Sequence, residues 1–429
     1  MRHLLATIGV LLAMALPLRA QSGTWSGKLD VQGIQLTMVV HFDEESCTLD
    51  SPDQGVKGIK GTRSQTALGG VRIDIPSINA AYEGFVMGEK IVGTFTQHGV
   101  SFPLTLTPGE FRRNRPQTPR PPFPYTTEEV SFSNGDAVLK GTLTLPENCD
   151  RKTPILLMVT GSGLQNRDEE LFEHKPFAVI ADALARAGIA TLRYDDRGFG
   201  ESTGDVVSCT TEDLKNDALS GVNLLRERFD HVGVIGHSEG GTIALMLAAG
   251  HKVDFAVSMA GMVVSGKETL LAQNRTILPH SGLTEQQTDT YCKALEEVFD
   301  CTIQGLRPVS PENLDLPDQW KQNLLAVAMQ SSTPYMKHFL QLDLRPELGS
   351  INCPVLALNG SKDIQVAPKD NLGALDSAIA APHYLSMEFE GLNHMFQHCK
   401  TGFTEEYKEI EETISPDVLK IIIDWILKL

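Results

Sequence analysis

The spacing of apolar residues changes once along this chain, near Tyr125. From Gly23 to about Pro108, apolar and polar residues alternate with a period of two, as in Val71–Ile75 and Phe102–Leu106, and glycine-rich turns separate the alternating runs. A period of two places alternate side chains on opposite faces of a strand. Residues 23–108 are therefore predicted to form a small antiparallel β domain, and we favour a packing role for it over a binding role.

Residues 109–124 follow with a different composition, rich in proline and arginine. The arginines cluster in Arg112–Pro116, and the prolines continue to Pro124. Prolines at this density predict an extended, semi-rigid linker. We interpret its basic cluster as a solvated face of the linker.

Residues 125–429 show a third pattern, in which short apolar runs alternate with helical periodicity. After a predicted hairpin (Val130–Phe132 and Ala137–Leu145), Ile155–Val159 is continuously apolar, as expected of a parallel strand buried on both faces. Further predicted strands are Ile189–Tyr194, Phe255–Met259, Val355–Asn359 and Leu385–Phe389. Strands alternating with amphipathic helices predict a mostly parallel, doubly wound α/β sheet.

One long segment, about residues 262–350, interrupts the alternation with helices alone. Its clearest helix start is the capping box Thr284–Gln287, and Trp320 and Phe339 are candidates for inward-facing residues. An insertion after a strand of such a sheet lies over the edge where catalytic loops gather, so we expect a helical lid. The alternative is a helical subdomain without a role at the site.

The most informative stretch is Val232–Gly241, in which an apolar run enters Gly-His-Ser-Glu-Gly and the helix-forming segment Thr242–Ala249 follows. A strand that turns at once into a helix holds one residue on a sharp, strained corner, and here that residue is Ser238. Gly236 and Gly240 remove side chains where strand and helix pass closest. The pattern predicts a nucleophilic serine, against the alternative of a simple strand-to-helix turn.

A serine nucleophile needs a histidine base and an acid that orients the base. His394 lies just after the last predicted strand, with His398 as the alternative, and Asp363 follows the preceding strand. The order Ser238, Asp363, His394 matches the triad order of this kind of sheet. Asp363 could instead be a helix cap or pair with Lys362.

An oxyanion hole needs two backbone N–H donors. We assign one to Glu239, which follows the nucleophile. The second is expected in the loop after Ile155–Val159, which reads Thr160-Gly161-Ser162-Gly163, and we choose Ser162, with Gly163 as the alternative.

Composition narrows the functional classes. The chain has 429 residues, 41% hydrophobic and 21% charged, with a net charge of −17. Such an acidic protein is a poor partner for nucleic acid or an anionic membrane surface. Residues 1–20 carry Arg2, an apolar run and a small residue at Ala20, which predicts a secretory signal peptide, and no other apolar stretch could span a membrane. Hence we expect an exported protein, periplasmic or secreted.

Seven cysteines are scattered along the chain, and a Cys292–Cys301 bridge is conceivable. No Cys-x-x-Cys or His-Glu-x-x-His pattern occurs, so no metal or cofactor is predicted.

Over about Tyr125–Leu429 the chain resembles the α/β-hydrolase superfamily, specifically its secreted bacterial serine esterases. The resemblance rests on Gly236–Gly241, Arg193–Ser202 and Leu392–His394. It implies an α/β-hydrolase fold with a helical cap insertion, preceded here by the β domain, and a Ser-His-Asp hydrolase. It also implies that Asp196 and Arg197 are architectural. The common His-Gly oxyanion loop of that family is Thr160–Gly161 in this sequence.

From these features we expect hydrolysis of a small-molecule carboxylic ester with a short or medium acyl chain. The alternatives are a serine peptidase, such as an aminopeptidase, an acyltransferase or thioesterase on the same triad, and a non-catalytic binding protein on the same fold.

Overall fold

The computed structural model describes residues 22–31, 34–54, 56–308, 310–379 and 384–429. The expected signal peptide, residues 1–20, lies outside the described residues. The chain divides into two compact units, one ending at Arg113 and the other spanning Asn114–Leu429.

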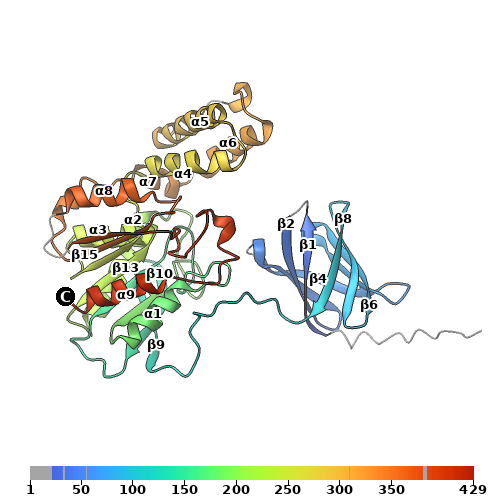
Figure 1. Ribbon diagram of the computed structural model, residues 1–429, viewed down its shortest axis with the longest axis horizontal. Coiled ribbons are helices and arrows are strands. Elements are labelled where there is room, and N and C mark those ends of the chain that lie inside the picture. Colours follow the sequence, from blue (N-terminus) through green and yellow to red (C-terminus); the bar gives the residue numbers. More distant parts are fainter. Residues whose placement is uncertain (1–21, 32–33, 55, 309, 380–383) are drawn as a thin grey trace, which may run out of the picture. The chain divides into compact units, whose positions relative to one another are not determined.

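The first unit is a closed antiparallel barrel of eight strands (blue to cyan in Figure 1), in which each strand pairs with the next and β1 pairs with β8. Its interior is filled by apolar side chains such as Trp25 and Ile73, and the buried Tyr82 hydroxyl donates to the carbonyls of Ile91 and Leu104 at 3.1 and 3.2 Å. The expected antiparallel β domain is confirmed, with a packed core. The strands are β1 Gly23–Val31, β2 Ile34–Phe42, β3 Ser46–Ser51, β4 Val56–Gln65, β5 Val71–Ile75, β6 Ala80–Met87, β7 Lys90–Gln97 and β8 Val100–Pro108.

The second unit contains an eight-stranded sheet in the order β16-β15-β14-β13-β11-β12-β10-β9. The hairpin β9–β10 is antiparallel, β10 pairs antiparallel with β12, and all other pairs are parallel. The α/β-hydrolase fold is therefore confirmed. The strands are β9 Tyr125–Asn134, β10 Ala137–Pro146, β11 Ile155–Val159, β12 Ala190–Tyr194, β13 Val232–His237, β14 Ala256–Met259, β15 Val355–Gly360 and β16 Leu385–Phe389.

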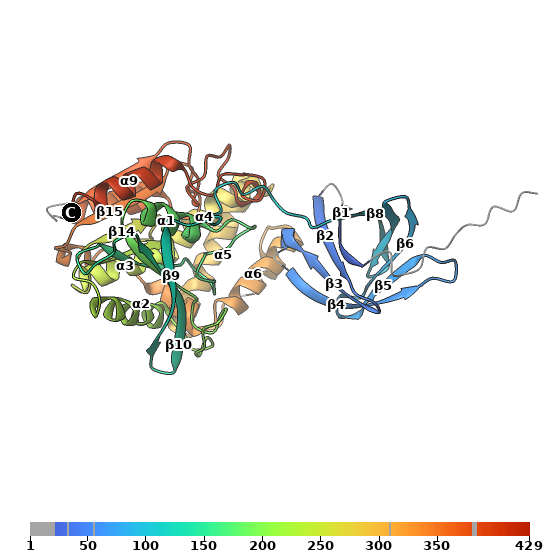
Figure 2. The same cartoon turned by 90° about the horizontal axis from the view of Figure 1, so that it is seen from below.

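Helices cover both faces of this sheet (Figures 1 and 2). Helices α1 (Pro176–Arg186) and α9 (Pro416–Ile426) pack on one face, with Phe177, Val418 and Ile422 in a shared core. Helices α2 (Thr211–Arg226), α3 (Glu239–Ala249) and α8 (Pro368–Ala378) pack on the other. The central strands are buried on both sides, which explains their continuous apolar runs.

The helical insertion lies between β14 and β15 and forms α4 (Gly266–His280), α5 (Glu285–Gln304), α6 (Asp318–Gln330) and α7 (Pro334–Gln341). These helices have a core of their own, in which Tyr291, Leu295 and Leu324 are buried. The capping box at Thr284 is present, since the Thr284 hydroxyl accepts the N–H of Gln287 at 3.2 Å.

Two details of the sequence interpretation need correction. All seven cysteines are free thiols, and a Cys292–Cys301 bridge is excluded because both lie on α5, roughly 13 Å apart along the helix at about 1.5 Å per residue. The basic cluster is solvated only at Arg112, which is exposed, because the Arg113 side chain is buried with its partner Asp53 and Arg115 is buried in the second unit. In the part of the chain that the structure describes, no helix is long and apolar enough to cross a membrane.

Candidate active site

Ser238 stands at the turn between β13 and α3 with φ 54° and ψ −119°, a left-handed conformation that a side-chain-bearing residue adopts only at a cost. The turn is possible because its neighbours lack side chains. A Cβ on Gly236 would lie 2.0 Å from the carbonyl oxygen of Gly240, and a Cβ on Gly240 would lie 2.0 Å from that of Val159. The corner therefore presents the Ser238 hydroxyl beyond the end of the sheet, as the sequence pattern predicts.

Asp363 and His394 come from the loops after β15 and β16 and meet there. The His394 Nδ1 atom lies 2.7 Å from Oδ2 of Asp363, and both side chains are buried. The other carboxylate oxygen of Asp363 accepts the N–H groups of Gln365 and Val366 at 2.8 and 2.9 Å. These bonds fix the carboxylate so that His394 presents its Nε2 atom away from the acid. Lys362 forms no such pair, because its ammonium donates to loop carbonyls.

Ser238 and His394 line one cavity of about 430 Å³. His398 does not: its side chain is 63% exposed and pairs with Glu412 at 2.9 Å. The structure thus brings Ser238, Asp363 and His394 to one place and leaves the alternative base on the surface.

The loop after β11 passes close to the nucleophile. A Cβ on Gly161 would approach the Cβ of Ser238 to 3.2 Å, and Gly163 has φ 92°, which favours glycine. The Gly161 N–H is taken by Oε1 of Glu169 at 2.7 Å, so Gly161 is no oxyanion donor. The N–H groups of Ser162 and Gly163 form no hydrogen bond with other described residues. Together with the N–H of Glu239, in the first turn of α3 where N–H groups have no intrahelical partner, they are available to an oxyanion.

The motif Arg193–Ser202 is bound to this loop by hydrogen bonds. The Asp196 carboxylate accepts the Thr160 hydroxyl and the Gln165 N–H, both at 2.8 Å. Burial raises the pKa of Asp196 to about 8, although these two hydrogen bonds act in the opposite direction. Arg197 forms a buried two-point pair with Asp217 on α2 at 2.6 and 2.7 Å. These contacts fit the architectural role that the resemblance implies for Asp196 and Arg197.

Two contacts beside the nucleophile were not expected from the sequence. Buried His237 joins Glu169 to the loop of His394. Buried Glu239 accepts the hydroxyl of Tyr335, from α7, at 2.5 Å and that of Thr211 at 2.7 Å. The insertion therefore reaches the nucleophile's helix through Tyr335.

Trp320 and Phe339, which we expected to face the site, instead pack against other aromatic residues of the insertion. Trp320 packs edge-on against Tyr291 with ring centroids 5.8 Å apart, inside the insertion's own core, and Phe339 stacks on Tyr335 at 5.9 Å. Neither is among the described residues that line the 430 Å³ cavity.

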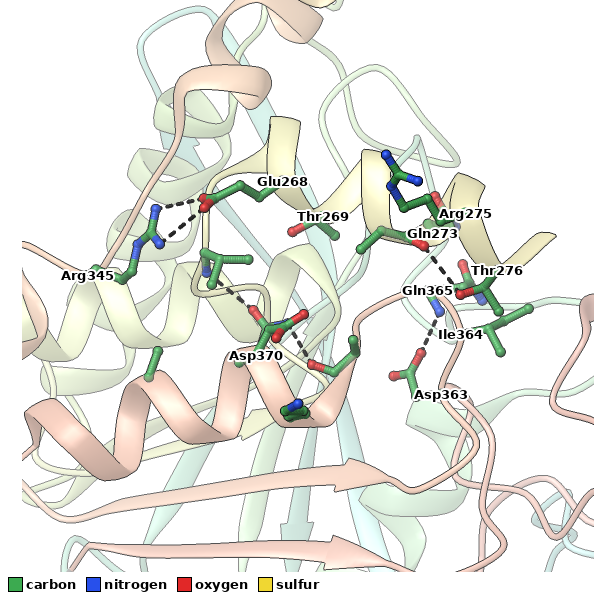
Figure 3. Close-up of a pocket in the computed structure, with 16 residues that line it drawn as sticks. Glu268, Thr269, Gln273, Arg275, Thr276, Arg345, Asp363, Ile364, Gln365 and Asp370 are labelled. Carbon is green, nitrogen blue, oxygen red and sulfur yellow. Dashed lines mark hydrogen bonds and ion pairs between the residues drawn. The ribbon is translucent and has the colours of Figure 1, made fainter. Parts of the chain in front are cut away.

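A larger cavity of about 800 Å³ lies between α4 and α8 (Figure 3). Its walls carry charges, including the pair of Glu268 and Arg345 at 2.6 Å. Gln365 lines both cavities. The loop that carries Asp363 therefore lies between two cavities. One is the 430 Å³ cavity that Ser238 lines, and the other is the charged cavity between α4 of the insertion and α8.

A serine at a strand-to-helix corner, a buried His-Asp pair beside it and an α/β-hydrolase sheet define a serine hydrolase of the esterase and peptidase type. The model of the X-Pro dipeptidyl-peptidase (S15) family matches residues 134–399, well over half of the chain. The chain belongs to this family.

Curated relatives include an esterase and a protein of the AB hydrolase superfamily. The chain is 26% identical over 281 residues to "Esterase EstD" of Thermotoga maritima, a match that covers 64% of this chain and 62% of the relative. It is also 26% identical over 204 residues to "AB hydrolase superfamily protein YisY" of Bacillus subtilis, covering 46% of this chain and 72% of that protein. The match thus spans less than two thirds of the length of EstD.

Among solved structures, the chain is similar to the Pyrococcus furiosus esterase Pf2001, with a TM-score of 0.45, 14% identity, and coverage of 71% of this chain and 91% of that chain. It is also similar to the proline iminopeptidase of Mycobacterium smegmatis, with a TM-score of 0.43, 17% identity, and coverage of 70% and 99%.

Proposed function

We propose that this protein hydrolyses carboxylic esters with short or medium acyl chains through a triad of Ser238, His394 and Asp363. The observation that carries the proposal is the buried 2.7 Å contact between His394 and Asp363 at the cavity that Ser238 lines. The size of this cavity, about 430 Å³, suits a small acyl group better than a long chain.

In the proposed reaction, the Ser238 hydroxyl attacks the ester carbonyl carbon while His394 takes its proton. The carbonyl oxygen becomes an oxyanion, which binds the N–H of Glu239 and that of Ser162 or Gly163. Collapse of this intermediate breaks the bond to the alcohol, which leaves with the proton from His394. Water, activated by His394, then hydrolyses the acyl-enzyme and frees Ser238.

The family description favours a second candidate, a serine peptidase that recognises the amino terminus of its substrate. Such recognition requires a carboxylate that is free to bind an ammonium group. Glu169 is the one acidic residue among the described residues that line the cavity. Its Oε1 atom is bound by Gly161 and His237, and its Oε2 atom, although without a hydrogen-bond partner among the described residues, is buried in a side chain that is 2% exposed, so an ammonium group of a substrate could not reach it from the cavity. This arrangement supports an ester substrate.

The test is a panel of p-nitrophenyl esters, from acetyl to decanoyl, beside aminoacyl-proline and aminoacyl p-nitroanilides. We expect acetyl to hexanoyl esters to be hydrolysed fastest. Efficient cleavage of the anilides, with negligible cleavage of acetyl and butyryl esters, would instead assign the protein to the peptidases.

The triad is tested by Ser238→Ala and His394→Ala, each expected to lower kcat by roughly three to six orders of magnitude, with little further loss when combined. Asp363→Asn should also be severely damaging, because the imidazole loses its orienting acceptor. A fluorophosphonate should label Ser238 in the wild type. An inactive His398→Ala beside an active His394→Ala would transfer the base to His398.

We also propose that the protein is exported, on the evidence of the signal-like residues 1–20. Fractionation of cells that produce the chain with and without residues 1–20 tests this proposal. Retention of the full chain in the cytoplasm would contradict it.

A further inference from the structure

His237, the residue before the nucleophile, is buried at the end of β13 with 6% of its surface exposed. Its Nδ1 atom lies 3.0 Å from Oε1 of Glu169, and its Nε2 atom lies 2.9 Å from the main-chain oxygen of His394. Both ring nitrogens therefore face oxygen atoms that only accept hydrogen bonds.

A neutral imidazole has a single N–H group, so it could satisfy one of these two acceptors and would set a nitrogen lone pair against the other. An imidazolium donates to both. Glu169 supplies the opposite charge at hydrogen-bond distance, which compensates for burying a cation.

The same pair connects three loops of the site. Oε1 of Glu169 also accepts the N–H of Gly161, in the oxyanion loop, at 2.7 Å. His237 itself adjoins Ser238, and its other nitrogen holds the backbone of His394, whose ring lies 4.7 Å away between centroids.

We propose that His237 is an imidazolium at neutral pH and that, with Glu169, it forms a positioning pair that fixes the oxyanion loop and the base loop relative to Ser238. Burial acts to lower the pKa of His237, but the charge and hydrogen bond of Glu169 outweigh it and the pKa is raised. His237 takes no part in proton transfer to substrate; it acts through His394 and Gly161.

The pair also affects the charge state of the base. The ring of His394 faces His237 on one side and Asp363 at its Nδ1 atom, while Tyr407 lines the same cavity and Glu169 lies beyond His237. Removing the cation of His237 leaves Glu169 as an uncompensated anion, so a positive charge on His394 becomes easier to form.

The kinetic test, which rests on the proposed function, uses His237→Gln, Glu169→Gln and the double variant with the fastest-cleaved ester. Each single variant should lose about 10- to 100-fold in kcat with KM within about threefold, because geometry and not binding is disturbed. The acid limb of the kcat/KM profile should move up by about one pH unit in His237→Gln and return toward the wild-type position in the double variant, which has neither charge.

The matched control is His398→Gln, which removes an exposed histidine paired with Glu412 at 2.9 Å, four residues from His394. It should leave kcat and the pH profile unchanged. An unmoved acid limb and an unchanged kcat in folded His237→Gln would overturn the positioning role.

A second measurement does not depend on turnover. In protein labelled with ¹⁵N-histidine, the His237 signals, identified by their loss in His237→Gln, should show both ring nitrogens protonated from pH 6 to 8. A non-protonated ring nitrogen in that range would overturn the imidazolium. Failure of the fluorophosphonate to label Ser238 would overturn the proposed function and leave this result standing.

Discussion

Replacing Tyr335 by Phe removes one oxygen atom from the contact between the helical insertion and the body of the hydrolase. The hydroxyl donates to Oε2 of Glu239 at 2.5 Å, and Glu239 is 2% exposed. Burial, followed by the charge of Glu239, raises the pKa of Tyr335 well above its usual range, so the hydroxyl keeps its proton at any working pH. The stacking of the ring on Phe339 is retained in the variant.

The magnitude follows from the type of bond. A hydrogen bond to a charged group contributes roughly 1.5–3 kcal/mol, and the buried carboxylate of Glu239 would keep only the hydroxyl of Thr211 at 2.7 Å. We expect the free energy of unfolding to fall by about 2 kcal/mol, which lowers Tm by about 4 °C in a large domain. Activity should fall as well, because the N–H of Glu239 is a proposed oxyanion donor and its residue becomes less firmly held.

Urea unfolding of both proteins measures the difference, with kcat on the fastest-cleaved ester as a second readout. Tyr384→Phe is the matched control, because its hydroxyl donates to the exposed Asp376 at 2.8 Å and should contribute less than about 0.5 kcal/mol. If the two variants lose equal stability, the contact of Tyr335 does not hold the insertion to the body.

Three further outcomes are expected. Arg197→Met should cost about 3–5 kcal/mol by urea unfolding, since it removes the cation from the buried carboxylate of Asp217 and leaves it only the amide of Asn134 at 2.8 Å. Glu169→Gln should lower the free energy of unfolding most below about pH 6.5. The effect should shrink as pH rises through the raised pKa of His237, because the wild-type pair loses its proton there. Unfolding measured from about pH 5 to 10 tests this dependence. Gly240→Ala should abolish ester turnover, because the new Cβ would lie 2.0 Å from a carbonyl oxygen of β11.

Gly240→Ala has a matched control on another helix. Gly373→Ala places a methyl group on α8 where nothing lies within 4 Å, so it should stabilise the helix by about 0.5–1 kcal/mol and leave turnover intact. A Glu169→Gln destabilisation that is equal at pH 5 and pH 10, or an Arg197→Met variant within 1 kcal/mol of the wild type, would contradict the corresponding reasoning.

The sequence alone predicts the fold and the candidate site residues that follow the ends of the strands. Alternation over residues 23–108 predicts antiparallel strands because the barrel buries only one face of each, and continuous apolar runs such as Ile155–Val159 predict strands covered on both faces. The positions of Ser238, Asp363 and His394 follow from the same argument, since the carboxyl ends of parallel strands meet at one edge.

Contacts between distant loops could not be predicted in this way. Glu169 and His237 are 68 positions apart, and Tyr335 and Glu239 are 96 apart. Periodicity states which face of an element is buried but not which polar side chains meet across it. The one available signal was a histidine inside an otherwise apolar and glycine-rich corner, where a buried titratable group needs a partner.

The hydrogen bonds of Arg115 determine where the hydrolase can be separated from the barrel. Its guanidinium donates to the main-chain oxygens of Phe172, Lys408 and Ile410 at 2.7 to 3.2 Å, and Phe172 lines the cavity of Ser238. The hydrolase therefore extends about ten residues upstream of its first strand, and this short segment belongs to the second unit of the chain. Anyone who exchanges the barrel for another domain should cut before Asn114, because a cut at Tyr125 would take away the donors that tie the wall of the active site together.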